Sequence, residues 1–312
     1  MGHVTFIHGI GNKTPAETLR SSWLTSLADN DGLELDAEGV SSSMIYWADF
    51  MYAAPLPESR GNESLEAVEK DGIEDVDMSW QAEADPEEQA MVARLEAKLE
   101  AARVQAGLVE TAAPPSSELE GREELLPPFL AQRFMKAFLR DVHHYLFNER
   151  YSPRAGVEYP VRDVIRDRAV ETLLQGAEQP GPHIVISHSM GTVIIYDCLK
   201  RVEATPRVDV LVTIGSPLGL TEIQDQLKPE WSRSNGFPGE RVSGRWLNVY
   251  DRIDVVALLD PKLANDYRRE DASVVNDLNE DNYGRWRHDI GKYLSGIRLR
   301  TELAGMLGLD WP

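Results

Sequence analysis

One serine in the second half of the chain stands where it could act as a nucleophile. Ser189 is the centre of the pentapeptide Ser187-His188-Ser189-Met190-Gly191. An apolar, strand-like run over 183–186 precedes it, and a helix is predicted over 191–202. A sharp strand-to-helix turn needs small residues two before and two after its central residue, here Ser187 and Gly191, and it exposes the central hydroxyl above the sheet. The pattern therefore predicts a nucleophilic serine. The alternative is an ordinary turn that contains a glycine.

A glycine-containing loop near the N-terminus could stabilise negative charge on a reacting oxygen. The loop His8-Gly9-Ile10-Gly11 directly follows a short apolar run over 4–7. An oxyanion hole needs two backbone N–H groups, one from the residue after the nucleophile and one from a loop after an earlier strand. We assign these donors to Met190 and Ile10. The alternative is a tight turn that needs its glycines for positive φ angles.

A serine hydroxyl needs a base, and the base needs a carboxylate that fixes its tautomer. In α/β folds with a nucleophile on such a turn, the chain order is serine, then acid, then histidine. Of the seven histidines only His288 follows Ser189, so His288 is the predicted base. The acid should follow a strand between them, and the strand predicted over 245–250 is followed by Asp251 and Asp254. We favour Asp254 as the acid, and Asp251 remains the second choice.

The elements that must hold these residues alternate between strands and helices. Strands are predicted over 4–7, 44–47, 183–186, 208–214 and 245–250, and helices over 15–27, 161–175, 191–202 and from about residue 289. This alternation indicates an α/β protein with a doubly wound, mostly parallel sheet.

The segment between the second predicted strand and the next helix differs in composition. The net charge of the whole chain is −20, and residues 58–124 alone hold 19 acidic and 6 basic side chains. The chain is therefore divided into an α/β core, residues 1–52 and 151–312, and an acidic, helical insertion over 53–150. Within the insertion, residues 53–82 are predicted to be mostly loop, and 114–117 a linker.

Two helices are predicted inside the insertion. Asp85 is a typical N-cap before Pro86, apolar residues follow at a spacing of four, and Gly107 could end that helix. The second helix begins at residues 127–128, and its apolar stripe could line an acyl pocket, although packing on the core is favoured: Phe134, Phe138, Leu139, Val142, Leu146 and Phe147. His143 and His144 lie on this helix beside Asp141, but nothing else at ligand spacing supports a metal, so no metal is assigned.

Taken together, these motifs resemble the α/β-hydrolase serine esterases and lipases. The residues that carry the resemblance are His8-Gly9-Ile10-Gly11, the pentapeptide around Ser189, Gly215-Ser216-Pro217, the stretch 248–256 and His288. Bacterial lipases and the serine esterases related to GPI inositol-deacylases are the most similar groups. The resemblance covers about residues 1–52 and 155–300. It implies the α/β-hydrolase fold, Ser189 as nucleophile, Asp254 as acid, His288 as base and a structural role for Asp251. Insertions in this fold commonly cover the site, so the insertion over 53–150 is expected to be a lid or cap.

The expected activity is hydrolysis of carboxylic esters through an acyl-enzyme, without a cofactor. An acyltransferase, thioesterase or amidase with the same triad and a non-catalytic interaction module are the alternatives. The expected partner is a small-molecule or lipid ester, with peripheral lipid contact left open.

The acidic charge argues against nucleic acid as a partner, and no apolar run is long enough for a membrane span. No signal peptide is recognisable, so a cytoplasmic location is expected, and export by a route without a cleaved signal is the alternative. The lone Cys198 is expected to be a buried small residue.

Overall fold

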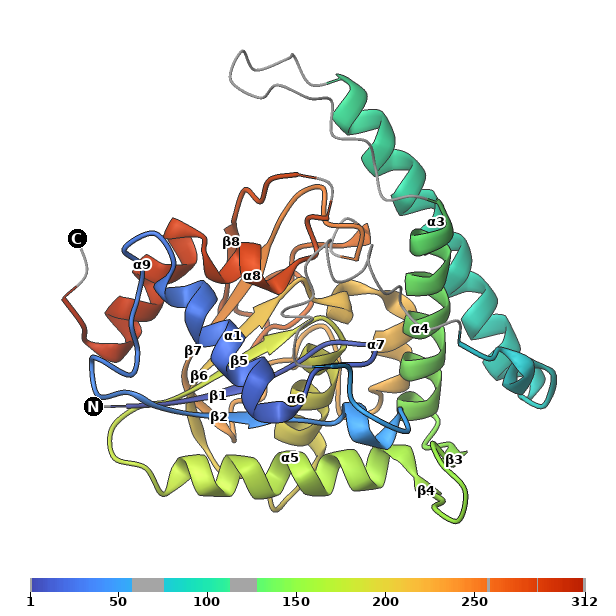
Figure 1. Ribbon diagram of the computed structural model, residues 1–312, viewed down its shortest axis with the longest axis horizontal. Coiled ribbons are helices and arrows are strands. Elements are labelled where there is room, and N and C mark those ends of the chain that lie inside the picture. Colours follow the sequence, from blue (N-terminus) through green and yellow to red (C-terminus); the bar gives the residue numbers. More distant parts are fainter. Residues whose placement is uncertain (1, 58–75, 113–127, 257–258, 285, 311–312) are drawn as a thin grey trace.

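The protein is built around a six-stranded, all-parallel sheet (Figure 1). The computed structural model describes residues 2–57, 76–112, 128–256, 259–284 and 286–310. The strand order is β2-β1-β5-β6-β7-β8. The strands are β1 (His3–Ile7), β2 (Ser41–Ile45), β5 (His183–His188), β6 (Val208–Ile214), β7 (Val242–Tyr250) and β8 (Val275–Asn279). The predicted α/β class and parallel sheet are confirmed.

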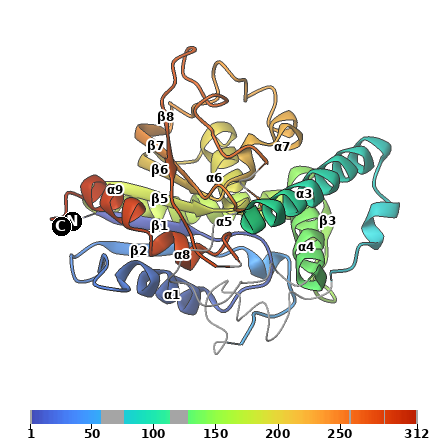
Figure 2. The same ribbon diagram turned by 90° about the horizontal axis from the view of Figure 1, so that it is seen from above.

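Helices cover both faces of this sheet. The alternation of side chains along β1 sends Val4 and Phe6 to one face and Ile7 to the other. On the first face lie α1 (Ala16–Ala28), α8 (Ile290–Leu294) and α9 (Ile297–Leu307), and on the second lie α5 (Val161–Ala177) and α6 (Met190–Arg201). Figure 1 shows α8 and α9 above the strands and α5 below them, and Figure 2 gives the view from above. Two separate apolar cores therefore sandwich the sheet.

The strand order changes direction between β1 and β5. The chain runs from β1 outward to β2 and later returns to β5 on the other side of β1. Ile7 pairs with Ser187, so β1 and β5 end side by side at the same edge of the sheet. Loops that leave two such strands diverge, and in open α/β sheets ligands bind at this point.

An inserted helical region follows β2. It comprises the short 3-10 helices η1 (Ala48–Phe50) and η3 (Ser79–Ala82), then α3 (Pro86–Ala112) and α4 (Pro128–Leu146). Asp85 caps α3 as predicted, because its Oδ1 accepts from the N–H groups of Glu87 and Glu88, while the Glu88 carboxylate accepts from the Asp85 N–H. The predicted end at Gly107 is wrong, since α3 continues to Ala112. The predicted linker 114–117 and most of the predicted loop lie outside the described residues.

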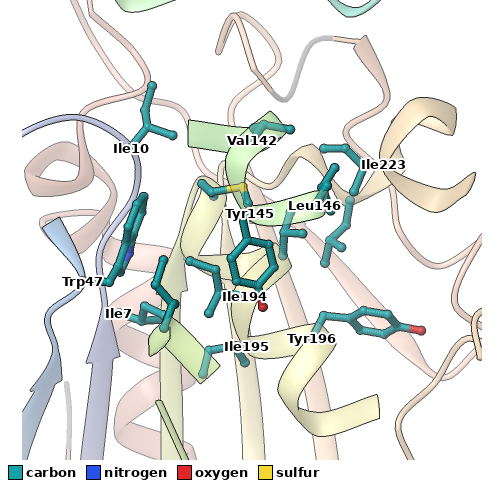
Figure 3. Packing of buried hydrophobic residues seen from close by; sticks show 14 of the residues in the cluster. Ile7, Ile10, Trp47, Val142, Tyr145, Leu146, Ile194, Ile195, Tyr196 and Ile223 are labelled. Atoms are coloured by element: carbon teal, nitrogen blue, oxygen red, sulfur yellow. The ribbon is translucent and has the colours of Figure 1, made fainter. Parts of the chain in front are cut away.

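Helix α4 packs into the main core. Five residues of its predicted apolar stripe are buried and belong to the cluster that also holds Ile7 and Ile194: Phe134, Phe138, Leu139, Val142 and Leu146. Figure 3 shows Val142, Tyr145 and Leu146 facing the side chains of α6. The Tyr145 hydroxyl also donates to Asp197 on α6 at 2.6 Å. Packing on the core, the favoured interpretation of the stripe, is confirmed.

Several elements differ from the predictions. Strand β8 and the short helix α7 (Thr221–Gln226) were not predicted, and β3 (Arg150–Tyr151) pairs with β4 (Tyr159–Pro160) in a small antiparallel hairpin. The helix expected near Asp289 begins at Ile290 with Asp289 as its cap, but it is divided into α8 and α9 at Ser295 and Gly296. None of the helices in the described parts of the chain has the length and apolar character that crossing a bilayer requires.

Candidate active site

Ser189 occupies a strained backbone conformation between β5 and α6. Its φ and ψ angles are 53° and −127°, a region that non-glycine residues rarely adopt and that costs about 1–3 kcal/mol. The surrounding structure holds it there: the Ser189 N–H donates to the Ile214 carbonyl at 2.9 Å, and the Ser187 hydroxyl donates to the Val212 carbonyl at 2.8 Å. Both acceptors belong to β6, so the neighbouring strand fixes the turn.

The small residues of the turn allow a close crossing of two elements. A Cβ at Gly191 would lie 2.6 Å from the His8 carbonyl oxygen, so no larger residue fits there. The N-terminus of α6 therefore lies directly against the loop after β1. Met190 is the first residue of α6, and its N–H has no acceptor inside the helix. This N–H group follows Ser189 directly, and its role as an oxyanion donor stays a prediction.

The loop after β1 lies directly against Ser189. A Cβ at Gly9 would lie 2.7 Å from the Ser189 Cβ and 3.3 Å from its Oγ. His8 holds the loop through Trp47: the Trp47 N–H donates to His8 Nε2 at 3.0 Å, and the Trp47 indole N–H donates to the His8 carbonyl at 2.9 Å. The two rings are stacked with centroids 4.9 Å apart. The first half of the loop is therefore rigid.

The peptide between Ile10 and Gly11 is held at both ends. The Gly11 N–H donates to Asp141 Oδ2 at 3.0 Å, and the Lys13 ammonium donates to the Ile10 carbonyl. Asp141 lies on α4 and accepts two further bonds, at 2.7 and 3.0 Å, from the buried guanidinium of Arg140. No described residue accepts the Ile10 N–H. The Ile10–Gly11 peptide is thus fixed in place and follows directly after Gly9, the residue that lies against Ser189.

His288 and Asp254 form a buried pair. His288 Nδ1 lies 2.9 Å from both carboxylate oxygens of Asp254, and their side chains are 2% and 0% exposed. The Tyr293 hydroxyl donates to Asp254 Oδ2 at 2.7 Å, and the Val256 N–H donates to Oδ1 at 2.9 Å. Burial alone would raise the pKa of Asp254, but the charge of His288 and these hydrogen bonds hold that pKa below its usual range. Asp254 is therefore an ionised acceptor that fixes the proton of His288 on Nδ1.

Gly215, the residue directly after β6, brings the pair next to the serine turn. A Cβ at Gly215 would lie 2.9 Å from Asp254 Oδ2 and 3.0 Å from His288 Nδ1. The carbonyl of the preceding residue, Ile214, accepts the hydrogen bond from the Ser189 N–H. His288 Nε2 and Ser189 Oγ are both buried, and neither has a hydrogen-bond partner among the described residues. The candidate nucleophile and base thus lie around two consecutive residues at the end of β6, Ile214 and Gly215.

Other side chains fix the ring of His288 from outside the pair. His188 Nε2 donates to the His288 carbonyl at 3.0 Å, and the two imidazole centroids lie 4.6 Å apart. Phe134 of α4 and Trp286 lie edge-on to the His288 ring, with centroids at 5.7 and 5.8 Å. These contacts shield the imidazole from water.

Asp251, the second choice for the acid, faces away from His288. Its carboxylate accepts from the N–H groups of Ile253 and Asn282, both at 2.6 Å, and from Arg287 at 3.2 Å. Burial raises the pKa of Asp251. Its geometry is that of a loop anchor, and of the two aspartates only Asp254 contacts the histidine.

Ser216, in the loop after β6, is buried and hydrogen-bonded to Thr192 at 2.8 Å. The prediction that Cys198 is a buried small residue is confirmed, and burial raises the pKa of its thiol.

Sequence reasoning missed Tyr293 altogether, and it did not assign the supporting roles of Gly215, His188 and Asp141. These residues all contact the site or its loops, yet each lies far along the chain from its partner. A tyrosine in an apolar helix and a glycine directly after a strand were the available signals. The described residues contain one cluster of three side chains that could hold a metal, and it involves α3 and α4 rather than these residues.

Comparison with models of known protein families gives no match, and no curated protein is found to be similar to the chain.

Proposed function

We propose that this chain is a serine hydrolase of the α/β-hydrolase fold that cleaves carboxylic esters. One observation carries the proposal: a buried His288–Asp254 pair lies beside Gly215, while Ser189 stands in a strained turn that is hydrogen-bonded to Ile214. The chain order serine, aspartate, histidine and the strand–turn–helix context agree with this fold. The switch point between β1 and β5 is also where such a sheet binds ligands.

The reaction would proceed in two halves. His288 Nε2 takes the proton from Ser189 Oγ as the oxygen attacks the ester carbonyl, and the backbone N–H groups of Ile10 and Met190 bind the oxyanion. The protonated His288 then gives its proton to the departing alcohol, which leaves an acyl-enzyme on Ser189. His288 next activates a water molecule, and its attack on the acyl group releases the acid and restores the serine.

The strained serine favours an enzyme over an interaction module. An interaction surface would gain nothing from a buried serine at φ 53°, and such strain persists chiefly at functional sites. An acyltransferase, thioesterase or amidase would use the same residues and differ in substrate or acceptor. Product analysis with added alcohols or amines separates these activities from ester hydrolysis.

Access to the site involves α4. Ser189 and His288 are only 1% and 2% exposed, so a substrate must displace side chains that cover them. Phe134 and Trp286 pack on each other, with ring centroids 4.9 Å apart, and both contact the His288 ring. We propose that this aromatic pair covers the acyl side of the site and moves aside for apolar acyl groups.

A fluorophosphonate probe tests the nucleophile directly. We expect one label per chain, on Ser189, together with hydrolysis of p-nitrophenyl esters across a series from acetyl to palmitoyl. The matched control is Ser216→Ala, which removes a buried serine one strand away and should label normally. A folded protein that neither labels nor hydrolyses any ester of the series would contradict the proposal.

A second prediction concerns the loop that carries the Ile10 donor. Asp141→Asn removes the charge that binds both the Gly11 N–H and Arg140. We expect kcat to fall about tenfold to a hundredfold with little change in KM, because a displaced oxyanion donor weakens only the transition state. Breaking the buried ion pair should also lower the free energy of unfolding by about 3 kcal/mol.

Arg140→Gln is the control for this effect. It breaks the same ion pair but leaves the Asp141 carboxylate on Gly11. We expect a similar loss of stability with a smaller loss of kcat, both measured at a temperature where circular dichroism shows folded protein. Equal losses of kcat in the two variants would mean that Asp141 acts only through stability.

A further inference from the structure

A second group of polar side chains lies between the start of α3 and the end of α4. It consists of Glu88 in the first turn of α3, His143 in the last turn of α4 and Glu149 just beyond that helix. One ligand atom from each residue lies within 4.8 Å of the other two. The three residues line a cavity of about 570 Å³. The proposed reaction at Ser189 uses none of them.

His143 is oriented by its neighbours. Its ring is stacked on Trp80, with centroids 4.2 Å apart, and its Nδ1 lies 3.2 Å from Nδ1 of His144. The opposite nitrogen, Nε2, lies 3.4 Å from the Glu88 carboxylate. A histidine that ligates a metal through one nitrogen usually donates its other N–H to a nearby acceptor. His144 Nδ1 can be that acceptor, and with its proton on Nδ1 His143 would offer the Nε2 lone pair to a cation held by the carboxylates.

The charges around the cavity favour a cation. Glu88 and Glu149 face each other, and Asp77 and Glu83 also line the cavity. Two arginines are present, but Arg140 is bound to Asp141 and Arg150 to Glu158. Ligand oxygens of Glu88 and Glu149 lie within 4.8 Å of each other, so a cation between the two carboxylates would offset their mutual repulsion.

We propose that Glu88, His143 and Glu149 bind a zinc ion, with water completing the coordination. One imidazole and two carboxylates are a donor set that suits Zn²⁺, whereas Ca²⁺ and Mg²⁺ prefer oxygen ligands alone. Tetrahedral ligands at about 2.0–2.1 Å from Zn²⁺ lie roughly 3.3 Å apart. Rotation of the two glutamate side chains can close the present spacing of up to 4.8 Å.

The ion would link three parts of the inserted helical region. Glu88 already accepts from the Asp85 N–H at the α3 cap, and His143 contacts Trp80 of η3. Zinc would therefore fix α3 and η3 on α4 and stabilise the folded protein by mass action. This role is independent of the proposed hydrolase activity.

Metal titration of the full chain tests the proposal. After treatment with EDTA and dialysis into metal-free buffer, Zn²⁺ is titrated in competition with a chromophoric chelator. We expect one ion per chain with a Kd in the micromolar range or below, and a melting temperature raised by about 4 °C or more under saturating Zn²⁺. Co²⁺ in place of Zn²⁺ should give the intense visible absorption of a four-coordinate site.

Three variants locate the ion. Glu149→Gln and Glu88→Gln should each weaken Zn²⁺ binding at least tenfold, and Glu88→Gln keeps an oxygen that can cap α3. His143→Gln should abolish the Co²⁺ absorption. Glu83→Gln is the control, because Glu83 lines the same cavity outside the cluster and its loss should leave the affinity unchanged. The proposal fails if no stoichiometric binding occurs, if Ca²⁺ competes equally with Zn²⁺, or if the affinity survives Glu149→Gln.

Discussion

Ser189→Ala is expected to lower kcat for ester hydrolysis about 10⁶-fold. Losing the nucleophile of a Ser-His-Asp triad removes the covalent pathway and leaves only the contribution of binding and the oxyanion hole. The fold should tolerate the change, because Ser189 Oγ has no hydrogen-bond partner among the described residues and alanine keeps the Cβ that contacts Gly9. Steady-state kinetics and thermal unfolding of the same preparations measure both effects.

Ser187→Ala is the matched control in the same turn. The Ser187 hydroxyl is buried and donates to the Val212 carbonyl at 2.8 Å, so its loss should lower the free energy of unfolding by about 1 kcal/mol. Because this hydroxyl does not face the reacting atoms, the variant should retain most of its activity. Opposite patterns in the two serine variants would separate chemistry from packing. Comparable activity in Ser189→Ala and the parent protein would remove Ser189 from the mechanism.

The parts of the site that could be predicted are those with local signals. Five consecutive residues between a strand and a helix identify the turn around Ser189. Four consecutive residues identify the loop at His8. His288 followed by elimination, since no other histidine lies after the serine. The structure was needed to choose between the two aspartates, because they lie three positions apart in one loop and its conformation decides which carboxylate contacts His288.

The parts that could not be predicted depend on contacts between distant residues. Asp141 reaches Gly11 across 130 residues, and Tyr293 reaches Asp254 across 39. No pattern in one sequence identifies such pairs, since each residue also fits an ordinary buried or surface position. The cluster at His143 illustrates the same limit: Glu88 and Glu149 approach it only because α3 packs on α4.

Secondary structure was missed where side chains contradict the usual pattern. Strand β8 has the sequence Val275-Asn276-Asp277-Leu278-Asn279, whose polar residues discourage a strand prediction. Among the described residues it pairs with β7 alone, as the outer strand of the sheet. The Asp277 carboxylate accepts hydrogen bonds from the N–H groups of Leu263 and Ala264 and from the Asn248 side chain. Tertiary hydrogen bonds therefore compensate for weak strand propensity.

Helix α3 was predicted to end too early. Gly107 is a common helix end, yet the helix continues to Ala112. The residues after Gly107 include Leu108, Glu110 and Ala112, which favour helix. A glycine inside a helix is destabilising by only about 1 kcal/mol, and good helix formers on both sides can offset this.

Asp254→Asn is expected to lower kcat about 10⁴-fold while leaving most of the structure intact. Asparagine can present its amide N–H to His288 Nδ1, which would place the ring proton on Nε2 and prevent that nitrogen from accepting the Ser189 proton. The amide also cannot stabilise the imidazolium that forms during the reaction. Kinetics with a p-nitrophenyl ester measure the loss, and the rate of fluorophosphonate labelling should fall in parallel because labelling needs the same base.

Asp251→Asn decides between the two acids. Asp251 accepts two backbone N–H groups and Arg287, so its replacement should reduce stability by a few kcal/mol and leave kcat within about tenfold of the parent. A 10⁴-fold loss in Asp251→Asn with an active Asp254→Asn would reverse the assignment. Tyr293→Phe, which removes one hydrogen bond to Asp254, should fall between these extremes. The hydroxyl of Tyr293 donates to the carboxylate without touching His288, so it can shift the basicity of the pair but cannot replace the ion that orients the imidazole.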